Sequence, residues 1–379
     1  MTLTFRQPEL LKALELALPI TRTKSVMPIL KNVALAINGH QCEIYTTNLE
    51  TYVKVKVRPE SSVPDFSAAV NADRLHEIVK NLRSDSPVEI SSADKARIVV
   101  SQNPNTSFRL NAVSLEDFPL FPEKVHGPET VEMEMAVADL TEALEAVTFS
   151  ASDSESRYRL NSVYLTSRND RFTLVSTDSH RLSCHDIDGK FAPPDGISGY
   201  LLPKSSAAYL LKWLPKFRTE KILLTINQKS LTVETEDHVV SVRLMDGAYP
   251  DYQKVIPSDM PAGFSVDRSM LIAAIKRVGL VTSERSRGIR MTREHSQSKL
   301  ELSAINADIG EAHETISIEP LAEFGFSKII NRDYALESLN SLKTSRVFLS
   351  VYDDMRKPVV MTAENPGARL TLVMPMREN

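Results

Sequence analysis

The stretch ADLTEALE at residues 138–145 has two relatives in this chain, PELLKALE at 8–15 and DRSMLIAAI at 267–275. In each, apolar residues recur at the spacing of one helix face. Their matching leucines, Leu10, Leu140 and Leu271, lie at nearly equal intervals, each about a third of the chain. In the second and third stretches, Asp139 and Asp267 stand where a helix N-cap is expected. This spacing predicts one structural unit written three times.

Two further landmarks recur at nearly the same interval. Polar residues follow predicted strands at Asn48, Asp178 and Asp308, which are equally spaced along the chain. A second helix is predicted over 71–83, 203–214 and 331–342, with Asp73, Ser205 and Asn331 as the expected caps. Strand-like stretches with alternating polarity follow each of these helices. The unit is therefore helix, strands, helix, strands, and the alternative of three coincidental α+β segments is disfavoured.

The repeats predict the fold class and the domain organisation. We expect an α+β protein of three similar domains, each with two helices packed on antiparallel sheets. Proline-rich connectors at 117–122 and 248–257 mark the boundaries, since proline ends sheets and favours linkers. The expected domains are 1–125, 130–257 and 259–379. An interface repeated with constant rotation closes into a ring or continues as a filament, and closure removes exposed sheet edges.

The charge distribution indicates what such a ring would hold. The net charge of −4 argues against a simple nucleic-acid binder. The second helices are nevertheless basic, because residues 203–218 carry four cationic side chains and no acid, and Arg74, Lys80, Arg332 and Lys343 recur on or beside the other two. Basic side chains that reach phosphates bind DNA without reading its sequence. The alternative is a set of solvated helix faces balanced by nearby acids.

Other functional classes find little support. Cys42 and Cys184 belong to no metal-binding spacing, so we expect no metal and no cofactor. Charged residues interrupt the N-terminal apolar stretch, and no run is long enough to span a membrane, so a cytoplasmic protein is expected. Asp178, Ser179 and His180 are hydrolase residue types, but they are neighbours on one loop rather than a convergent triad. A repeat scaffold that binds proteins and never DNA stays an alternative.

Several short stretches match a known family. They are MPILKN at 27–32, RYRLN at 157–161, TDSHRL at 177–182, YPDY at 249–252 and VMPMR at 373–377. On these residues the whole chain resembles the bacterial sliding clamp, the beta subunit of DNA polymerase III.

The resemblance implies a head-to-tail homodimer of six domains that encircles double-stranded DNA. Such a ring tethers a polymerase, confers processivity and has no catalytic chemistry. The implied partners are the polymerase III alpha subunit, the delta subunit of the clamp loader, and other polymerases and repair proteins that dock short linear peptides.

Positions carried over from the family predict three sites. The partner-peptide groove comprises Leu160, Thr177, Ser179, His180, Arg181, Leu182, Pro250, Lys254, Val255, Asn331, Tyr334, Pro358, Val373, Met374, Pro375 and Met376. The DNA contacts are Lys24, Tyr158, Arg159 and Lys204. The subunit interface places Phe108 and Leu110 of the first domain against Leu280 and Val281 of the third. The alternative for the groove residues is that they simply pack the junction of two domains.

The chain departs from the family pattern at three places. Ser179 stands where glycine is common, Ser286 stands where an aromatic residue can flank the groove, and the chain ends in Glu378 and Asn379. These changes predict a shifted peptide preference. They also leave open whether this is a main replication clamp or a second copy with altered partners.

Overall fold

The protein is described from a computed structural model, which covers residues 2–23, 26–39, 41–61, 63–94, 96–122, 127–217, 219–260, 263–284, 287–295, 297–320, 324–352, 354–363 and 369–377. Its helices and antiparallel strands follow one order three times, which confirms the α+β repeat predicted from the sequence. The three opening helices begin at Gln7, Val137 and Arg268, and the three second helices at Ala72, Lys204 and Arg332.

The first repeat contains β1 (Thr2–Arg6), α1 (Gln7–Thr21), η1 (Pro28–Lys31), β2 (Asn32–Gly39), β3 (Gln41–Thr47), β4 (Thr51–Val57), β5 (Val63–Asn71), α2 (Ala72–Asn81), β6 (Pro87–Asp94), β7 (Arg97–Asn103), β8 (Thr106–Val113) and η2 (Leu115–Asp117).

The second repeat contains β9 (Val131–Ala136), α3 (Val137–Val147), η3 (Thr148–Ser150), η4 (Glu155–Leu160), β10 (Ser162–Arg168), β11 (Arg171–Thr177), β12 (Arg181–Lys190), β13 (Gly199–Pro203), α4 (Lys204–Trp213), η5 (Leu214–Lys216), β14 (Lys221–Ile226), β15 (Ser230–Glu234), β16 (His238–Arg243) and η6 (Tyr252–Val255).

The third repeat contains β17 (Gly263–Asp267), α5 (Arg268–Val278), η7 (Gly279–Val281), β18 (Gly288–Arg293), β19 (Lys299–Asn306), β20 (Gly310–Ser317), β21 (Glu319–Pro320), β22 (Phe326–Asn331), α6 (Arg332–Ser341), β23 (Arg346–Ser350), β24 (Val359–Ala363) and β25 (Arg369–Val373).

The helix caps lie on the last residue of the preceding strand. Asn71, Asp267 and Asn331 accept hydrogen bonds from main-chain amides of the first helical turn, at 3.0, 2.7 and 2.9 Å. The caps expected at Asp267 and Asn331 are confirmed. Those expected at Asp73, Asp139 and Ser205 are wrong, because strand passes directly into helix and all three residues lie inside the helix.

The turn that follows the middle strands also repeats. In the first two repeats the acceptor is the first turn residue, since Asn48 Oδ1 binds the amide of Thr51 (2.7 Å) and Asp178 Oδ1 that of Arg181 (3.0 Å). The third turn is shorter, and there Asn306 rather than Asp308 accepts the amide bonds. The expectation that Asp308 is the counterpart of Asn48 and Asp178 is therefore wrong, and Asn306 takes that role.

The chain forms two compact units, Met1–Val137 with Lys212–Leu244, and Ala138–Leu211 with Met245–Asn379. The first unit holds a twelve-stranded sheet in the order β1-β6-β7-β8-β5-β2-β3-β4-β16-β15-β14-β9. The second holds a nine-stranded sheet, β13-β10-β11-β12-β25-β24-β23-β17-β21, and a four-stranded sheet, β20-β19-β18-β22. The strands of the middle repeat are thus shared between the two larger sheets. The boundaries 1–125, 130–257 and 259–379 stay predictions.

One strand pairing joins neighbouring repeats in both units. In the first unit β4 pairs with β16, from Val55 opposite His238 to Thr51 opposite Val242. In the second unit β12 pairs with β25, from His185 opposite Arg369 to Arg181 opposite Val373. Each residue of the β4–β16 pairing corresponds, in the next repeat, to a residue of the β12–β25 pairing. The two pairings therefore have the same register. We call this arrangement the repeat junction.

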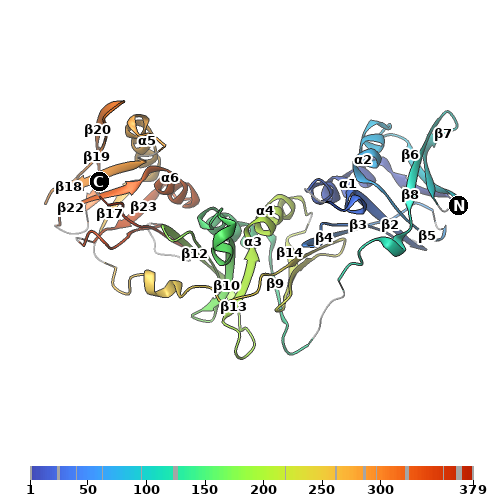
Figure 1. Ribbon diagram of the computed structural model, residues 1–379, viewed down its shortest axis with the longest axis horizontal. Helices are drawn as coiled ribbons and strands as arrows, with labels where there is room; N and C mark the ends of the chain where they lie inside the picture. Colours follow the sequence, from blue (N-terminus) through green and yellow to red (C-terminus); the bar gives the residue numbers. More distant parts are fainter. Residues whose placement is uncertain are drawn as a thin grey trace. The chain divides into compact units, whose positions relative to one another are not determined.

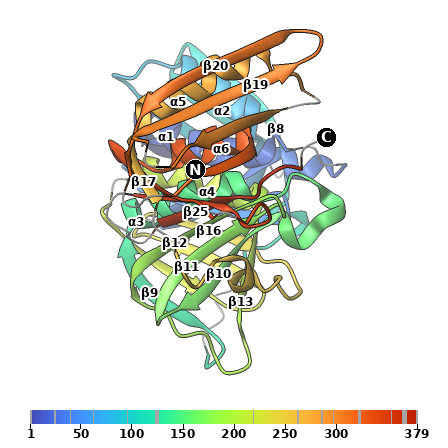
Figure 2. The ribbon, with the colours of Figure 1, turned by 90° about the vertical axis from the view of Figure 1, so that its left-hand side faces the viewer.

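The opening helices anchor the core of each repeat. Leu10, Leu140 and Leu271 are at most 2% exposed. Helix α1 packs against β3 and β4 beside α2, and α5 lies under the β19–β20 hairpin (Figures 1 and 2). Each buried leucine contributes roughly 2 kcal/mol of hydrophobic stabilisation.

Gly263 permits close packing where β17 enters the nine-stranded sheet. Opposite Ser350 in β23, its position leaves no room for a side chain, because a Cβ atom there would overlap the main-chain carbonyl of Leu349. Gly263→Ala should therefore lower the free energy of unfolding by about 1–3 kcal/mol through overpacking. Gly127→Ala is the control, since a Cβ at that position meets nothing within 4 Å. Urea titration followed by circular dichroism tests this, and equal midpoints would contradict it.

Candidate functional site

The TDSHRL motif forms the tight turn between β11 and β12. Asp178 Oδ1 accepts hydrogen bonds from the amides of His180 (2.9 Å) and Arg181 (3.0 Å), and Thr177 Oγ1 accepts one from Ser179 (3.1 Å). This side-chain bonding is typical of Asp in turns. Ser179 lies at φ 78°, a left-handed conformation that favours glycine. Ser179 therefore occupies a position whose backbone conformation is more favourable for glycine.

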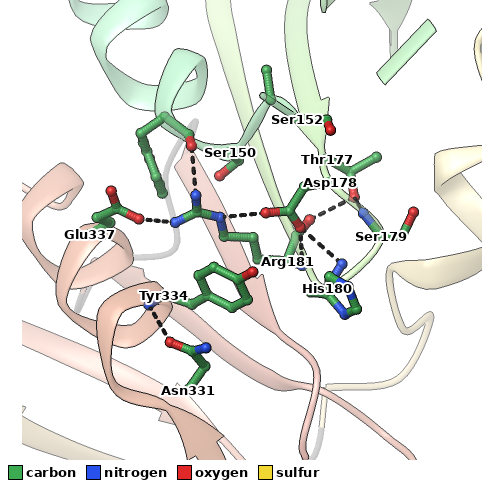
Figure 3. A network of polar contacts seen from close by, with 12 residues as sticks. Ser150, Ser152, Thr177, Asp178, Ser179, His180, Arg181, Asn331, Tyr334 and Glu337 are labelled. Atoms are coloured by element: carbon green, nitrogen blue, oxygen red, sulfur yellow. Dashed lines mark hydrogen bonds and ion pairs between the residues drawn. The ribbon is translucent and has the colours of Figure 1, made fainter. Parts of the chain in front are cut away.

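Arg181 connects this turn to helix α6. Its side chain is buried, and all three guanidinium nitrogens donate: Nε to Asp178 (3.0 Å), Nη1 to Glu337, and Nη2 to the Phe149 carbonyl (2.8 Å) (Figure 3). The guanidinium carbon also lies 4.4 Å from the centre of the Tyr334 ring. Such pairing offsets the cost of burying a charge. Arg181, which the family resemblance places in the partner-peptide groove, thus makes these bonds within the chain.

Tyr334 and His180 form an aromatic pair on the exposed side of this network. Their ring centres are 6.2 Å apart with the planes inclined by 20°. Asn331 fixes the start of α6 beneath them by accepting the amide of Tyr334 (3.3 Å) (Figure 3). Burial, and then the nearby Asp178 carboxylate, raise the pKa of Tyr334, so its phenol is neutral at physiological pH. The pair offers a flat aromatic surface with a polar edge.

The VMPMR segment runs alongside this pair and is fixed through its main chain. Val373 lies opposite Arg181 in the β12–β25 pairing. The amide of Met374 donates to the His180 carbonyl (2.8 Å), and that of Met376 to the Ile329 carbonyl (2.7 Å). Both methionine side chains and Pro375 are half-buried. The backbone is therefore held while two adaptable apolar side chains stay within reach of a ligand.

The YPDY motif packs behind the turn. The Tyr249 hydroxyl accepts the Thr177 amide (3.0 Å), and its ring stacks on Tyr164 at 4.7 Å between centres. Leu182, Met374 and Tyr249 belong to one apolar cluster. Lys254, which follows the motif, pairs with Asp251 at 3.1 Å.

The predicted groove residues divide by exposure. Buried members are Arg181, Leu182, Pro358 and Val373; half-buried members are Leu160, Thr177, Asn331, Tyr334, Met374, Pro375 and Met376; exposed members are Ser179, His180, Pro250, Lys254 and Val255. Their use as a groove stays a prediction. The sequence did not point to Glu337 and Phe149, which are two of the three hydrogen-bond partners of Arg181. Glu337 follows Tyr334 by about one helical turn, so helical spacing was a usable signal.

The predicted DNA contacts have different surroundings. Tyr158 is 47% exposed, and its hydroxyl accepts a hydrogen bond from Arg159 Nε (2.8 Å). Lys204 Nζ binds the Asp153 carboxylate (2.6 Å) and the Ala151 carbonyl (2.7 Å). Lys24 lies outside the described residues, as do Arg218, Ser286, Glu378 and Asn379.

The predicted interface residues differ in exposure. Leu280 is 79% and Phe108 39% exposed, while Leu110 and Val281 are half-buried. Within the described ranges, no three His, Cys, Asp or Glu side chains gather in a way that would hold a metal ion. No helix in the described part of the chain is long and apolar enough to cross a bilayer.

Comparison with known proteins identifies three matching family models. They are the DNA polymerase III beta subunit N-terminal domain over residues 1–122, its central domain over 134–251 and its C-terminal domain over 253–377. The beta sliding clamps of Pseudomonas aeruginosa and Haemophilus influenzae are 27% and 26% identical, and each match covers all of both chains. The crystal structure of the P. aeruginosa beta subunit superimposes with a TM-score of 0.92 at 25% identity, again over the whole of both chains.

The conformation of Ser179 leads to a stability prediction. Glycine relieves roughly 1–2 kcal/mol of left-handed strain and costs about 0.5–1 kcal/mol of additional chain entropy. Ser179→Gly should therefore raise the free energy of unfolding by about 0.5–1 kcal/mol. Ser179→Ala keeps the Cβ atom and should leave stability unchanged. Paired urea titrations measure both, and a glycine variant no more stable than the alanine variant would refute the strain argument.

Proposed function

The chain belongs to the DNA polymerase III beta-subunit family and is a sliding clamp, and we propose that it closes into a homodimeric ring whose partner site is the junction of its second and third repeats. A sliding clamp is a processivity factor that holds a polymerase on DNA and has no catalytic chemistry of its own. The residues assigned below to DNA, to partners and to the second subunit are part of this proposal.

The repeat junction is the observation that supports ring closure. It occurs twice within the chain in equivalent register, as β4 with β16 and as β12 with β25. In the third repeat the strand that corresponds to β4 and β12 is β20. In the first repeat the strand that corresponds to β16 and β25 is β8. Within the described residues, β20 pairs only with β19, and Thr106–Asn111 of β8 only with β7. Pairing β8 of one copy with β20 of another would form the missing junction.

The side chains near these edges suit a head-to-tail contact. Phe108 and Leu280 supply exposed apolar surface, with Leu110 and Val281 half-buried beside them. Arg109 on β8 and Glu311 on β20 are exposed and opposite in charge. Two such heterologous contacts close a dimer and leave no free edge. The closed ring encircles duplex DNA in our proposal.

DNA contact inside the ring is assigned to four polar side chains. Tyr158 and Arg159 present an aromatic ring and a guanidinium, which suit a sugar and a phosphate. Lys204 forms an ion pair with Asp153, whose side chain is 91% exposed. A DNA phosphate can therefore reach this ion pair and replace the Asp153 carboxylate as the partner of Lys204. Lys24 completes the proposed set. Contacts of this kind bind any sequence, as a sliding ring requires.

Partner binding is assigned to the surface around Met374, Met376, His180 and Tyr334. Its support is the combination of a fixed main chain and accessible apolar side chains, which lets several peptides use one site. The proposed partners are the polymerase III alpha subunit, the delta subunit of the clamp loader, and other polymerases and repair proteins. The proposal places this activity in the cytoplasm.

The partner site can be tested at its methionines. A labelled peptide carrying the clamp-binding segment of the alpha subunit reports on this site. Replacing both Met374 and Met376 by Ala should lower the affinity of the clamp for this peptide by at least about tenfold, because both apolar anchoring side chains are removed. Met270→Ala, at a methionine 43% exposed on α5, is the control. Fluorescence anisotropy gives the affinity. Unchanged binding with an intact dimer would count against this site.

Ring closure can be tested at Leu280 and Val281. Replacing both by Ala should shift the dimer toward monomer and abolish retention on nicked circular DNA, because the proposed interface core is small and apolar. Leu120→Ala, at a connector residue 80% exposed, is the control.

Analytical ultracentrifugation and gel filtration of clamp loaded on circular or linearised DNA provide the measurements. A double variant that is still fully dimeric at low concentration would overturn the interface assignment. Equal retention of the native protein on circular and linear DNA would favour the scaffold alternative.

A further inference from the structure

The short turn η7 carries the most exposed apolar residue of the proposed subunit interface. Leu280 is 79% exposed, and its neighbour Val281 is half-buried against the core of the third repeat. The turn packs against β19 and β20, and β20 is the strand proposed to pair with β8 of a second copy. A side chain that extends into solvent does little to hold its own backbone. The position of Leu280 therefore depends on what fixes the main chain of η7.

Arg332, the first residue of α6, bonds to both ends of this turn. Its Nη1 donates to the Gly279 carbonyl (3.0 Å) and to Thr282 Oγ1 (2.8 Å), and that hydroxyl donates in turn to the Gly279 carbonyl (2.8 Å). Asp333 orients the guanidinium by accepting a hydrogen bond from its Nε (2.8 Å). Hydrogen bonds from a charged donor are stronger than those between neutral groups. Arg332 thus ties the main chain of η7 to the start of α6.

Gly279 is a second observation that links Arg332 to this turn. Its φ of −65° and ψ of −12° are helical, so the backbone conformation does not require glycine. A Cβ atom at this position would instead overlap Cδ of Arg332. Glycine is therefore needed for the close approach of Arg332, and a larger residue would push the guanidinium away from the carbonyl that it binds.

The other two repeats also join the second helix to the loop that follows the opening helix. In the second repeat Lys204, the first residue of α4, donates from Nζ to the Ala151 carbonyl (2.7 Å). In the first repeat the direction is reversed, because Arg22 follows α1 and donates to Asp73 of α2 (2.8 Å). A polar bond at this place is therefore a feature of the repeat, and in the third repeat it holds the loop that carries Leu280.

The residue that corresponds to Leu280 in the second repeat makes contacts at a repeat junction. The repeat spacing places Phe149 at this position. Its carbonyl accepts a hydrogen bond from Arg181 Nη2 (2.8 Å), and its ring centre lies 5.3 Å from the guanidinium carbon of Arg181 on β12. The loop after the opening helix is thus part of the junction between β12 and β25. In the third repeat the equivalent junction is the proposed contact with a second copy.

We propose that Arg332 is a positioning residue of the subunit interface, which holds η7 so that Leu280 and Val281 face the second copy before the ring closes. An apolar anchor contributes more to affinity when its backbone is already ordered, because less conformational freedom is lost on binding. Arg332 acts through the turn and does not have to touch the second subunit. The inference rests on the proposed ring and on its assignment of Leu280 to the interface.

The dissociation constant of the full-length dimer tests this role, and fluorescence-detected ultracentrifugation over a dilution series measures it. Arg332→Ala should raise this constant at least about tenfold, as expected when charge-assisted bonds that order the turn are lost. Arg356→Ala is the matched control, because the Arg356 side chain is 91% exposed and pairs only locally, with Asp354. The control should dimerise like the native protein.

Two double variants separate positioning from a general loss of stability. Combined with Leu280→Ala, Arg332→Ala should weaken the dimer by much less than it does alone, because the main anchor that it positions is gone. Independent effects would multiply instead. Gly279→Ala should weaken the dimer by itself, and it should have no further effect in the Arg332→Ala protein, where the overlapping side chain is absent.

The outcomes distinguish this inference from the proposed function. An Arg332→Ala protein as dimeric as the native one, or effects of Arg332→Ala and Leu280→Ala that multiply, would overturn the positioning role. If circular dichroism shows that Arg332→Ala does not fold, Gly279→Ala decides in its place. If Leu280→Ala itself leaves the dissociation constant unchanged, the interface assignment fails and this inference fails with it.

Discussion

Antiparallel strand pairing at the edges of each repeat is the constraint on which the rest of this structure depends. A repeat with two helices and many strands covers its sheet faces but leaves edge strands whose amides and carbonyls need partners. The chain meets this need twice by joining β4 to β16 and β12 to β25 in equivalent register. Each of the two larger sheets therefore contains strands of two neighbouring repeats. For the same reason, the boundaries of the two compact units do not coincide with the boundaries of the repeats. The same need at β8 and β20 underlies the proposed dimer.

The two repeat junctions differ in the charged side chains that they bury. In the second unit, Arg181 and Arg369 lie buried with acids and carbonyls from neighbouring elements around them. A buried guanidinium with fixed partners permits few alternative arrangements, and these two hold β12 and β25 against α3 and α6. In the first unit the positions that match Glu142 and Arg369 carry Lys12 and His238, and a cavity is present instead. Similar backbones thus present different chemistry because a few side chains differ in charge and length.

A sliding clamp is a processivity factor and not a catalyst, and this role determines which contacts serve it. A ring that must move along DNA gains nothing from base-specific contacts, because each would have to be broken at every step. A surface that serves several partners likewise benefits from adaptable methionines on a fixed backbone rather than from a rigid pocket. At the proposed partner site the network around Arg181 supplies such a fixed backbone, since it positions the turn to which the Met374 amide is bonded.

The sequence by itself determined the repeat, the order of helices and strands and the family, because periodic apolar residues and short motifs are local signals. It located the turn at Asp178 but misplaced the caps at Asp73, Asp139 and Ser205, since strand runs into helix without a linker. Only the tertiary structure decided that Arg181 bonds to Glu337 and Phe149, and that Arg369 fills a space left open beside His238. Those contacts join residues far apart in the chain, and their formation depends on the register of the strand pairs that bring them together.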